Sequence, residues 1–335
     1  MAEFELIDRI RARAAHLRDD VVLGIGDDAA LLQPPPGRQL VVTMDTLNEG
    51  VHFPSGTAAA DIGWKALAVN LSDLAAMGAE PAWCTLSLSL PDGDQAWTDG
   101  FIDGFLSLAS AHRVALVGGD TTRGPLSVSV TVHGFVEPGR ALRRGGARVG
   151  DGVWVSGALG GAAGALAQWR AGAAADPAER APGQGGVGVR VDAALRERLE
   201  RPCPRLALGR ALAGVASACI DVSDGVFADL GHVCAASGVA ARLEVDALPG
   251  SDLLRPYFDA DDLRALQATG GDDYELCFTA PGDADAAVRA AAAAAGPGIE
   301  VTRIGTVLAG QGVQAFDRVG RPWRPAQAGH EHFGD

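Results

Sequence analysis

The sequence predicts a two-domain protein that mixes helices and strands, in the α/β or α+β class. The chain has 335 residues, which is more than one hydrophobic core usually organises. Segments with strand-like alternation and segments with helical periodicity follow one another along its whole length. A Gly- and Arg-rich stretch at residues 140–150 precedes a new apolar strand, so we place the boundary near residue 146 and expect domains 1–146 and 147–335.

The first half of the chain alternates helical and extended segments. Residues 3–17 place apolar side chains at helical spacing, and residues 126–136 alternate apolar side chains with Ser, Thr or His, which is typical of a strand with one buried face. The proline-rich turn at residues 34–37 separates two strands, which predicts a hairpin. In order we expect helix 3–17, strand 21–25, strand 39–44, helix 58–78, strand 83–90, helix 95–112, strand 114–117 and strand 126–136.

The second half predicts another unit of mixed structure. Residues 171–189 are rich in Ala, Gly and Pro and are expected to form a loose excursion. Ser223 or Asp224 is expected to cap the helix that follows. In order we expect strand 152–156, helices 192–200 and 204–216, strand 218–220, helix 225–236, strand 240–245, helix 259–268, strand 274–279, helix 284–295 and strands 299–307 and 312–317.

The charge of the chain limits what it can bind directly. Its net charge is −14, and Lys65 is the single lysine among 28 basic residues, which form no cluster. Direct contact with nucleic acid or an anionic membrane is therefore not expected. A P-loop is excluded because no Gly-x-x-x-x-Gly-Lys-Ser/Thr motif occurs. An anionic ligand would need bridging metal ions.

The cysteines and the N-terminal residues predict a compartment. The five cysteines are odd in number and lack Cys-x-x-Cys spacing, which is typical of buried thiols in a reducing environment. The first residues carry acids where a signal peptide needs basic residues and an apolar core. No apolar stretch reaches the roughly 20 residues of a membrane helix. We therefore expect a soluble cytoplasmic protein.

Aspartates recur where apolar runs end, often after glycine. Mg²⁺ prefers oxygen ligands, and glycine allows a tight turn and the close approach of a phosphate. Each aspartate alone could equally be a turn or cap residue. Their repetition favours a shared metal–nucleotide site, where cations offset a repulsion of about 4 kcal/mol per close pair at an effective dielectric of about 20. The aspartates are Asp27, Asp28, Asp45, Asp73, Asp120, Asp221, Asp224, Asp272 and Asp273.

Two other polar positions lie close to these aspartates. Asn70 and Asp73 are three residues apart on a predicted helix, so they share a face. His52 follows Asp45 in a polar loop and either faces a ligand or is structural. Hydrolase alternatives are disfavoured, because the chain has neither a Gly-x-Ser-x-Gly elbow nor a His-Glu-x-x-His pair.

Seven motifs carry a family resemblance. They are GIGDDAAL at 24–31, DTL at 45–47, VHF at 51–53, KALAVNLSDLAAMGA at 65–79, GGDTTRG at 118–124, IDVSDG at 220–225 and GGDDYEL at 270–276. Together they resemble the thiamine-monophosphate kinase family, in the superfamily of aminoimidazole-ribonucleotide synthetase and selenophosphate synthetase. The resemblance covers essentially the whole chain.

The resemblance implies a fold, a reaction and site residues. It implies an N-terminal domain whose sheet pairs with a second subunit in a homodimer, an α/β C-terminal domain, and phosphorylation of thiamine monophosphate by ATP with several Mg²⁺ ions. The metal positions it carries over are Asp28, Thr43, Asp45, Asp73, Asp120, Asp221 and Asp224. The nucleotide contacts are Gly119, Asp120, Arg144 and Ser223, and the substrate contacts are His52, Asp272 and Gln327.

Two substrate positions depart from the family pattern. The family often has Glu where this chain has Asp272, which shortens the reach by one methylene. An aromatic residue that would face the thiamine rings aligns with Gln327. Trp323, four residues earlier, is an alternative source of that aromatic contact. Within the first motif, Asp27 is expected to be a turn residue and Asp28 a metal ligand.

The implied reaction is in-line transfer of the γ-phosphoryl group to a phosphate oxygen. A phosphate monoester has a second pKa of about 6, so it is largely ionised at neutral pH and needs no general base. A resemblance to selenophosphate synthetase would call for a reactive Cys and Lys near the N-terminus. This alternative is disfavoured because the first cysteine is Cys84 and the only lysine is Lys65. The VHF and DVSDG motifs disfavour an aminoimidazole-type ligase. A non-catalytic protein that binds Mg²⁺ and nucleotide stays open as an alternative.

Overall fold

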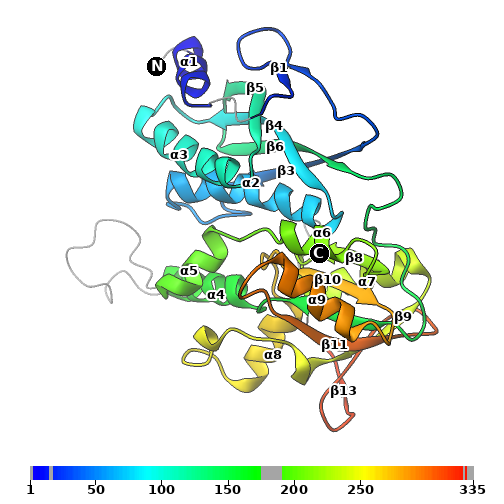
Figure 1. Ribbon diagram of the computed structural model, residues 1–335. Coiled ribbons are helices and arrows are strands. Elements are labelled where there is room, and N and C mark those ends of the chain that lie inside the picture. The colour runs from blue at the N-terminus through cyan, green and yellow to red at the C-terminus, as the bar shows by residue number, and fades with distance from the viewer. Residues whose placement is uncertain (1–2, 15–17, 175–190, 327–328, 330–335) are drawn as a thin grey trace. The chain divides into compact units, whose positions relative to one another are not determined.

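The structure is a computed structural model that forms two compact units (Figure 1). The described residues are 3–14, 18–174, 191–326 and 329. The first unit spans Met1–Leu74 and Ala79–Ala141, and the second spans Ala75–Gly78 and Leu142–Asp335. Both units combine sheets with helices, as the sequence predicts.

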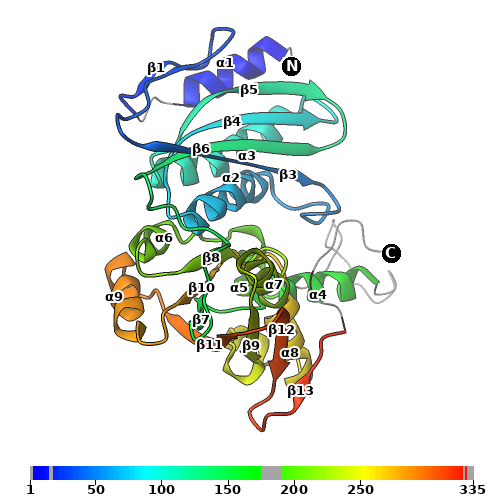
Figure 2. The same cartoon turned by 90° about the vertical axis from the view of Figure 1, so that its right-hand side faces the viewer.

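The first unit is built on a four-stranded sheet. Its elements are α1 (Glu3–Arg13), β1 (Val21–Leu23), β2 (Leu31–Leu32), β3 (Gln39–Asn48), α2 (Ala59–Ala76), β4 (Glu80–Leu90), α3 (Gln95–Ala111), β5 (Ala115–Arg123) and β6 (Ser127–Val136). The strand order is β3-β6-β4-β5, which leaves β3 and β5 at opposite edges. Helices α2 and α3 lie against one face of the sheet (Figure 2).

The two faces of this sheet differ in polarity. Val128, Val130 and Val132 of β6 are buried, whereas the intervening Ser129 and Thr131 are half-buried, so the predicted alternation is confirmed. Cross-strand partners share a face of a sheet. One register row crosses all four strands on the polar face, and it consists of Thr46, Ser129, Ser87 and Asp120.

The hairpin expected between residues 21–25 and 39–44 is wrong. β1 pairs with the short strand β2, and β3 pairs along its length with β6. β3 instead pairs with β6 over its whole length, from Gln39 opposite Val136 to Asn48 opposite Ser127, and this long-range ladder takes the place of the expected hairpin. β3 also continues beyond its expected end, so Asp45 lies within the strand.

The second unit is built on a seven-stranded sheet with the order β13-β12-β9-β11-β7-β10-β8. Val153, Ile220 and Leu243 belong to its buried core. Its elements are β7 (Gly152–Ser156), α4 (Gly161–Ala174), α5 (Ala193–Glu200), α6 (Leu206–Leu212), β8 (Ala218–Asp221), α7 (Val226–Ser237), β9 (Ala240–Glu244), η2 (Val245–Ala247), η3 (Asp252–Leu254), α8 (Ala260–Thr269), β10 (Leu276–Ala280), α9 (Asp285–Ala295), β11 (Val301–Leu308), β12 (Gly312–Phe316) and β13 (Pro322–Trp323).

Helix α4 was not predicted, and its last residues were assigned to a loose excursion. Its sequence is mostly Ala and Gly, which gives little hydrophobic periodicity. The helix is stabilised by packing, because Ala162 and Ala165 are buried against Leu195 and Leu254. The rest of the expected excursion, residues 175–189, lies outside the described residues. Among the described helices, none combines the length and apolarity needed to cross a bilayer.

The N-terminus of α7 is capped differently from the prediction. Gly225 occupies the N-cap with φ 112°, and neither Ser223 nor Asp224 caps the helix through its side chain. Instead Asp229, in the first turn, accepts hydrogen bonds from the backbone N–H groups of Asp224 and Gly225, both at 3.1 Å. The acid therefore reaches back from inside the helix to satisfy donors that precede it.

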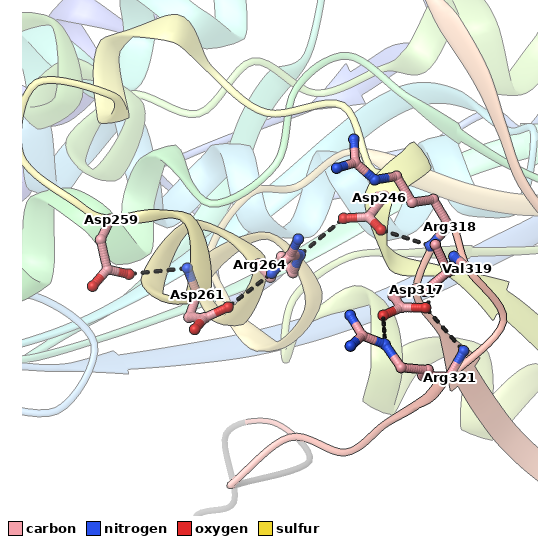
Figure 3. Close-up of polar contacts among 8 residues, drawn as sticks. All are labelled: Asp246, Asp259, Asp261, Arg264, Asp317, Arg318, Val319 and Arg321. Atoms are coloured by element: carbon pink, nitrogen blue, oxygen red, sulfur yellow. Dashed lines mark hydrogen bonds and ion pairs between the residues drawn. The ribbon is translucent and has the colours of Figure 1, made fainter.

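A polar network ties helix α8 to the C-terminal hairpin (Figure 3). Arg264 donates to Asp246 at 2.8 Å, and the second oxygen of Asp246 accepts the N–H of Arg318 at 2.7 Å. These contacts hold the pKa of Asp246 below its ordinary value. Asp317 closes the turn by accepting from Arg321 at 2.8 Å. The network fixes the turn between β12 and β13 against α8.

A buried ion pair joins α6 to the start of β10. The guanidinium of Arg205 donates two hydrogen bonds to the carboxylate of Glu275, at 2.6 and 2.5 Å. Ser156 donates a third, at 2.5 Å. The side chain of Glu275 is only 3% exposed, so its charge depends on these partners.

Asp273 caps helix α4 from a distant part of the sequence. Its carboxylate accepts the N–H of Gly160 at 2.7 Å and that of Ala162. Burial raises the pKa of Asp273 to about 8, and the nearby charges of Glu275 and Asp272 act in the same direction. Asp273 therefore serves the fold by holding the first turn of α4.

The first prediction concerns the ion pair. Arg205→Leu should lower the free energy of unfolding by about 3–5 kcal/mol, because it leaves the buried carboxylate of Glu275 without its counter-charge. Arg255→Leu is the matched control, since Arg255 and Asp252 form a pair whose side chains are 76% and 88% exposed. The control should lose less than about 1 kcal/mol. Urea unfolding measures both values, and equal losses would contradict a structural role for the buried pair.

The second prediction concerns the pH dependence of stability. The folded-state pKa of Asp273 is about 8 and that of the unfolded chain about 4. The folded state therefore binds a proton between these values, and its stability falls as pH rises through this window. Asp273→Asn keeps an accepting oxygen but cannot ionise. Its unfolding free energy relative to wild type should increase from pH 5 to pH 8 on the order of 1 kcal/mol or more.

Urea unfolding at several pH values measures this difference for Asp273→Asn. Asp252→Asn is the control, because that side chain is 88% exposed and its substitution should give a difference that does not vary with pH. A flat profile for Asp273→Asn would show that Asp273 is not the proton-binding group.

Candidate metal and phosphate site

The first unit holds two of the predicted carboxylates side by side. Alternate residues of β3, Thr43 and Asp45, lie on the helix-covered face of the sheet. Thr43 donates through its hydroxyl to Asp73 of α2, and Asn70, one turn earlier on α2, accepts the backbone N–H of Asp45 at 3.0 Å. This confirms that Asn70 and Asp73 share a face. Packing of α2 against β3 therefore brings the carboxylates of Asp45 and Asp73 together.

The surroundings of Asp45 disfavour the charged form of its carboxylate. Burial raises its pKa to about 6, and the charge of Asp73 adds to the effect. The surrounding side-chain donors and acceptors are oxygens from a hydroxyl, two carboxylates and an amide, which is the ligand set that Mg²⁺ prefers. A divalent cation would remove the repulsion between the two carboxylates. These residues therefore fit the metal that the sequence predicts.

Asp120 lies elsewhere in the same unit. It is exposed on the opposite edge strand β5, in the polar register row, whereas Asp45 lies on β3 and the helix-covered face. Three strand spacings separate the two strands, which is about 14 Å. Within one chain, these two predicted metal ligands therefore do not meet.

Asp28 belongs to the loop between β1 and β2. Val21 and Leu32 of these strands pack against Ala115 and Val117 of β5. The loop is therefore attached to the β5 side of the unit, not to β3. Asp27 accepts the N–H of Asp28 at 2.8 Å, as expected of a turn residue.

Hydrogen bonds of Lys65 and His52 fix the loop that follows β3. The Nδ1 atom of His52 accepts the N–H of Asn48 at 3.0 Å, and the Nζ atom of Lys65 donates to the carbonyl of His52 at 2.9 Å. Lys65 is buried in α2. The single lysine of the chain therefore holds the main chain of the loop that carries His52.

The second unit gathers its predicted residues at two turns. Asp221 ends β8 and is buried, and Ser223 and Asp224 follow it before α7. Ligand atoms of Asp224, Asp229 and His232 lie within 4.8 Å of one another. Burial and the charge of Asp224 raise the pKa of Asp229 to about 7. This turn therefore concentrates acidic groups at the N-terminal end of a helix.

The segment that carries Asp272 is bonded directly to this turn. The N–H of Asp272 donates to the carbonyl of Ser223 at 2.9 Å, and the N–H of Tyr274 donates to that of Val222 at 2.8 Å. A Cβ atom on Gly271 would lie 2.5 Å from the carbonyl oxygen of Ser223, so only glycine fits there. The two motifs, 220–225 and 270–276, thus form one structure.

Arg144 and Ser223, both predicted nucleotide contacts, lie near opposite ends of α7. The carbonyl of Arg144 accepts from Ser237 at the end of α7, while Ser223 precedes its start. The helix has 12 residues, a length of about 18 Å. Gln327 lies outside the described residues, but Gly329 packs against Asp224 and Ala228.

Trp323 has a packing partner of its own. Its ring meets that of Phe227 edge to face, with centroids 6.5 Å apart, and both rings lie against the core of the second unit. The structure therefore gives Trp323 a packing role.

Several residues that shape these sites were not singled out as site residues. Arg205 lies far in sequence from its partner Glu275, and no local pattern reveals the pair. Asp229 and His232 are three residues apart on α7, and that spacing after the DVSDG motif was an available signal. Tyr274 lies within the GGDDYEL motif, but its left-handed backbone is visible only in the structure.

Comparisons with known proteins cover nearly the whole chain. The family models described as AIR synthase related protein, N-terminal domain, and AIR synthase related protein, C-terminal domain, match residues 26–136 and 148–318. Thiamine-monophosphate kinase of Salmonella typhimurium strain LT2 is 43% identical over 336 residues, covering 99% of this chain and 98% of the relative.

Two solved structures extend this likeness to the fold. Thiamine-monophosphate kinase from Stenotrophomonas maltophilia K279a matches with a TM-score of 0.82 and 56% identity, over 94% of this chain and 96% of that one. AaThiL complexed with AMPPCP and TMP matches with a TM-score of 0.73 and 32% identity, over 98% and 97% of the two chains. The predicted two-domain fold is confirmed. The chain belongs to the thiamine-monophosphate kinase family of the AIR synthase related proteins.

Proposed function

We propose that this protein transfers the γ-phosphoryl group of ATP to thiamine monophosphate, giving thiamine diphosphate. The observation that carries the proposal is the likeness, over 98% of this chain, to AaThiL complexed with AMPPCP, an ATP analogue, and TMP. The carboxylate pair on β3 and α2 gives independent support, because its oxygen ligands suit the Mg²⁺ that accompanies ATP.

The transfer is in-line and uses no general base from the protein. The attacking phosphate oxygen is already ionised at neutral pH, so the protein has to hold two anions close together and in line. When bound, Mg²⁺ would shield the phosphate charges. Thr43, Asp45 and Asp73 would hold one ion in the first unit, and Asp221 and Asp224 would hold another in the second.

The remaining site residues receive binding roles. A Cβ atom on Gly119 would lie 1.9 Å from the carbonyl oxygen of Leu86, so no side chain fits at this position. The backbone is therefore open to close approach by a ligand. Gly119, Ser223 and the exposed Arg144 are proposed to contact the nucleotide, the last as a bidentate phosphate ligand. His52, Asp272 and Gln327 are proposed to contact thiamine monophosphate.

A homodimer is proposed to complete the metal site. Leu40, Val42 and Met44 lie on one face of edge strand β3 and are 52%, 54% and 61% exposed, an apolar stripe that a second copy of the sheet would cover. Because Asp45 and Asp120 do not meet within one chain, the second subunit would supply Asp120. The same argument applies to Asp28. Asp28 and Asp120 are thus proposed as metal ligands in trans.

The thiols support the proposed compartment. Cys84, Cys219, Cys234 and Cys277 are buried and Cys203 is exposed, all as free thiols. Free thiols persist in a reducing environment, so we propose that the enzyme acts in the cytoplasm.

The third prediction tests the reaction and the metal group together. Wild-type protein should consume ATP when thiamine monophosphate is present and form thiamine diphosphate. Asp45→Asn should lower turnover by more than about 100-fold, because it removes a metal ligand. The fold should persist, since the substitution also relieves the repulsion from Asp73. Mg²⁺ should raise the melting temperature of wild type and not that of the variant.

Product detection and thermal unfolding provide the readouts for Asp45→Asn. Asp252→Asn, in an exposed 3₁₀ turn of the second unit, should behave as wild type in both. ATP consumption without thiamine monophosphate would point to another reaction. Near-normal turnover of Asp45→Asn at saturating Mg²⁺ would exclude Asp45 as a ligand.

The fourth prediction tests whether the site spans two subunits. Asp45→Asn and Asp120→Asn should each be inactive, and mixing them under conditions of subunit exchange should restore about a quarter of wild-type activity. In a mixed dimer one of the two sites is then intact, and about half of the dimers are mixed. A mixture of Asp45→Asn with Asp73→Asn is the control, because both residues belong to the same group and no activity should return.

Recovery of activity measures the arrangement directly. Failure of the first mixture, when exchange of labelled subunits is demonstrated, would show that Asp45 and Asp120 act within one chain.

A further inference from the structure

Asp272 is held by the side chain of its second neighbour. The hydroxyl of Tyr274 donates to Oδ1 of Asp272 at 3.0 Å. The Tyr274 residue is only 8% exposed. A buried phenol hydroxyl needs a partner, and here its partner is a proposed substrate-contacting carboxylate.

The backbone of this segment adopts an uncommon conformation. Asp272 has φ 66° and Tyr274 has φ 48°, and both values lie in the left-handed region that favours glycine. For a bulky residue such as Tyr this conformation is an unfavourable outlier. Such a backbone persists only where its surroundings fix it.

The surroundings do fix it from both sides. The N–H groups of Asp272 and Tyr274 are bonded to the turn before α7, and the side chain of Asp273 is bonded to the start of α4. These contacts leave the segment little freedom to relax. They also turn the side chains of Asp272 and Tyr274 toward each other, whereas that of Asp273 faces α4.

We propose that Tyr274 is a positioning residue, which sets the direction in which Asp272 presents its carboxylate to thiamine monophosphate. The inference rests on the proposed function. Asp has one methylene fewer than Glu, so its reach is short and a wrong rotamer cannot be corrected by a longer chain. The hydrogen bond from Tyr274 removes rotamer freedom before the substrate arrives, which lowers the entropic cost of binding.

The chain supplies a matched control for this role. It contains two tyrosines, and the other, Tyr257, also donates to an aspartate, with its hydroxyl 2.9 Å from Oδ2 of Asp192. Tyr257→Phe therefore removes the same kind of bond from a pair that no proposed site residue joins. Tyr257 is 52% exposed and Tyr274 only 8%, so the melting temperatures are compared as well, to separate the effect of burial from that of the position of the bond.

The test compares the kinetics of Tyr274→Phe and Tyr257→Phe with wild type. Tyr274→Phe should raise KM for thiamine monophosphate about two- to tenfold, the range expected for one hydrogen bond. Its KM for ATP should not change, and the melting temperatures of both variants should stay within a few degrees of wild type. Tyr257→Phe should leave both KM values unchanged.

A double-mutant cycle identifies the residue through which Tyr274 acts. On an Asp272→Ala background, which removes the acceptor, Tyr274→Phe should raise KM for thiamine monophosphate no further. Additive effects, or kinetics of Tyr274→Phe equal to those of Tyr257→Phe in an active enzyme, would overturn the inference alone. Wild-type protein inactive with thiamine monophosphate would overturn the proposed function and the inference together.

Discussion

The burial of carboxylates, several of them close to one another, is the constraint on which the sites of this acidic chain depend. Where an acid serves the fold, the structure supplies donors: the guanidinium of Arg205 for Glu275, and backbone N–H groups next to helix starts for Asp273 and Asp229. Asp45 faces Asp73 instead, and its pKa rises to about 6. Burial still raises the pKa of Asp273 to about 8 and that of Asp229 to about 7, but their hydrogen bonds are satisfied within the fold. A bound cation would offset the charges of Asp45 and Asp73.

The junction of β3 and α2 brings these two carboxylates together through ordinary packing. α2 lies against the sheet with its apolar side chains, so the polar residues on the same helix face meet the polar residues of β3. Asn70 then fixes the main chain of Asp45, which prevents the strand from moving away from Asp73. Because β3 is also an edge strand, the acidic pair lies at a border where a second subunit can reach it.

Most elements of the fold could be predicted because their signals are local. Periodicity located the helix at 95–112 and the strand at 126–136, and glycine before aspartate marked the turn at 270–272 but not at 118–120, which lies within β5. Strand pairing could not be predicted, since the β3–β6 ladder joins distant segments, and the turn at residues 36–37 does not pair β1 with β3. For the same reason, the separation of Asp45 from Asp120 could not be predicted. Sequence motifs indicate that both serve one reaction, but only the strand order shows that they lie on opposite edges.

The two Gly-Gly-Asp motifs show how context decides what a motif does. At residues 118–120 the backbone is held along β4, with Gly119 beside Leu86, so it continues the strand and leaves Asp120 exposed at a sheet edge. At residues 270–272 the neighbour is the turn before α7, and the chain bends into a left-handed conformation that no strand could adopt. The first motif therefore leaves its aspartate exposed on an edge strand, whereas the aspartate of the second accepts a hydrogen bond from the hydroxyl of Tyr274. The same three residues therefore adopt different conformations, because the backbone beside them differs.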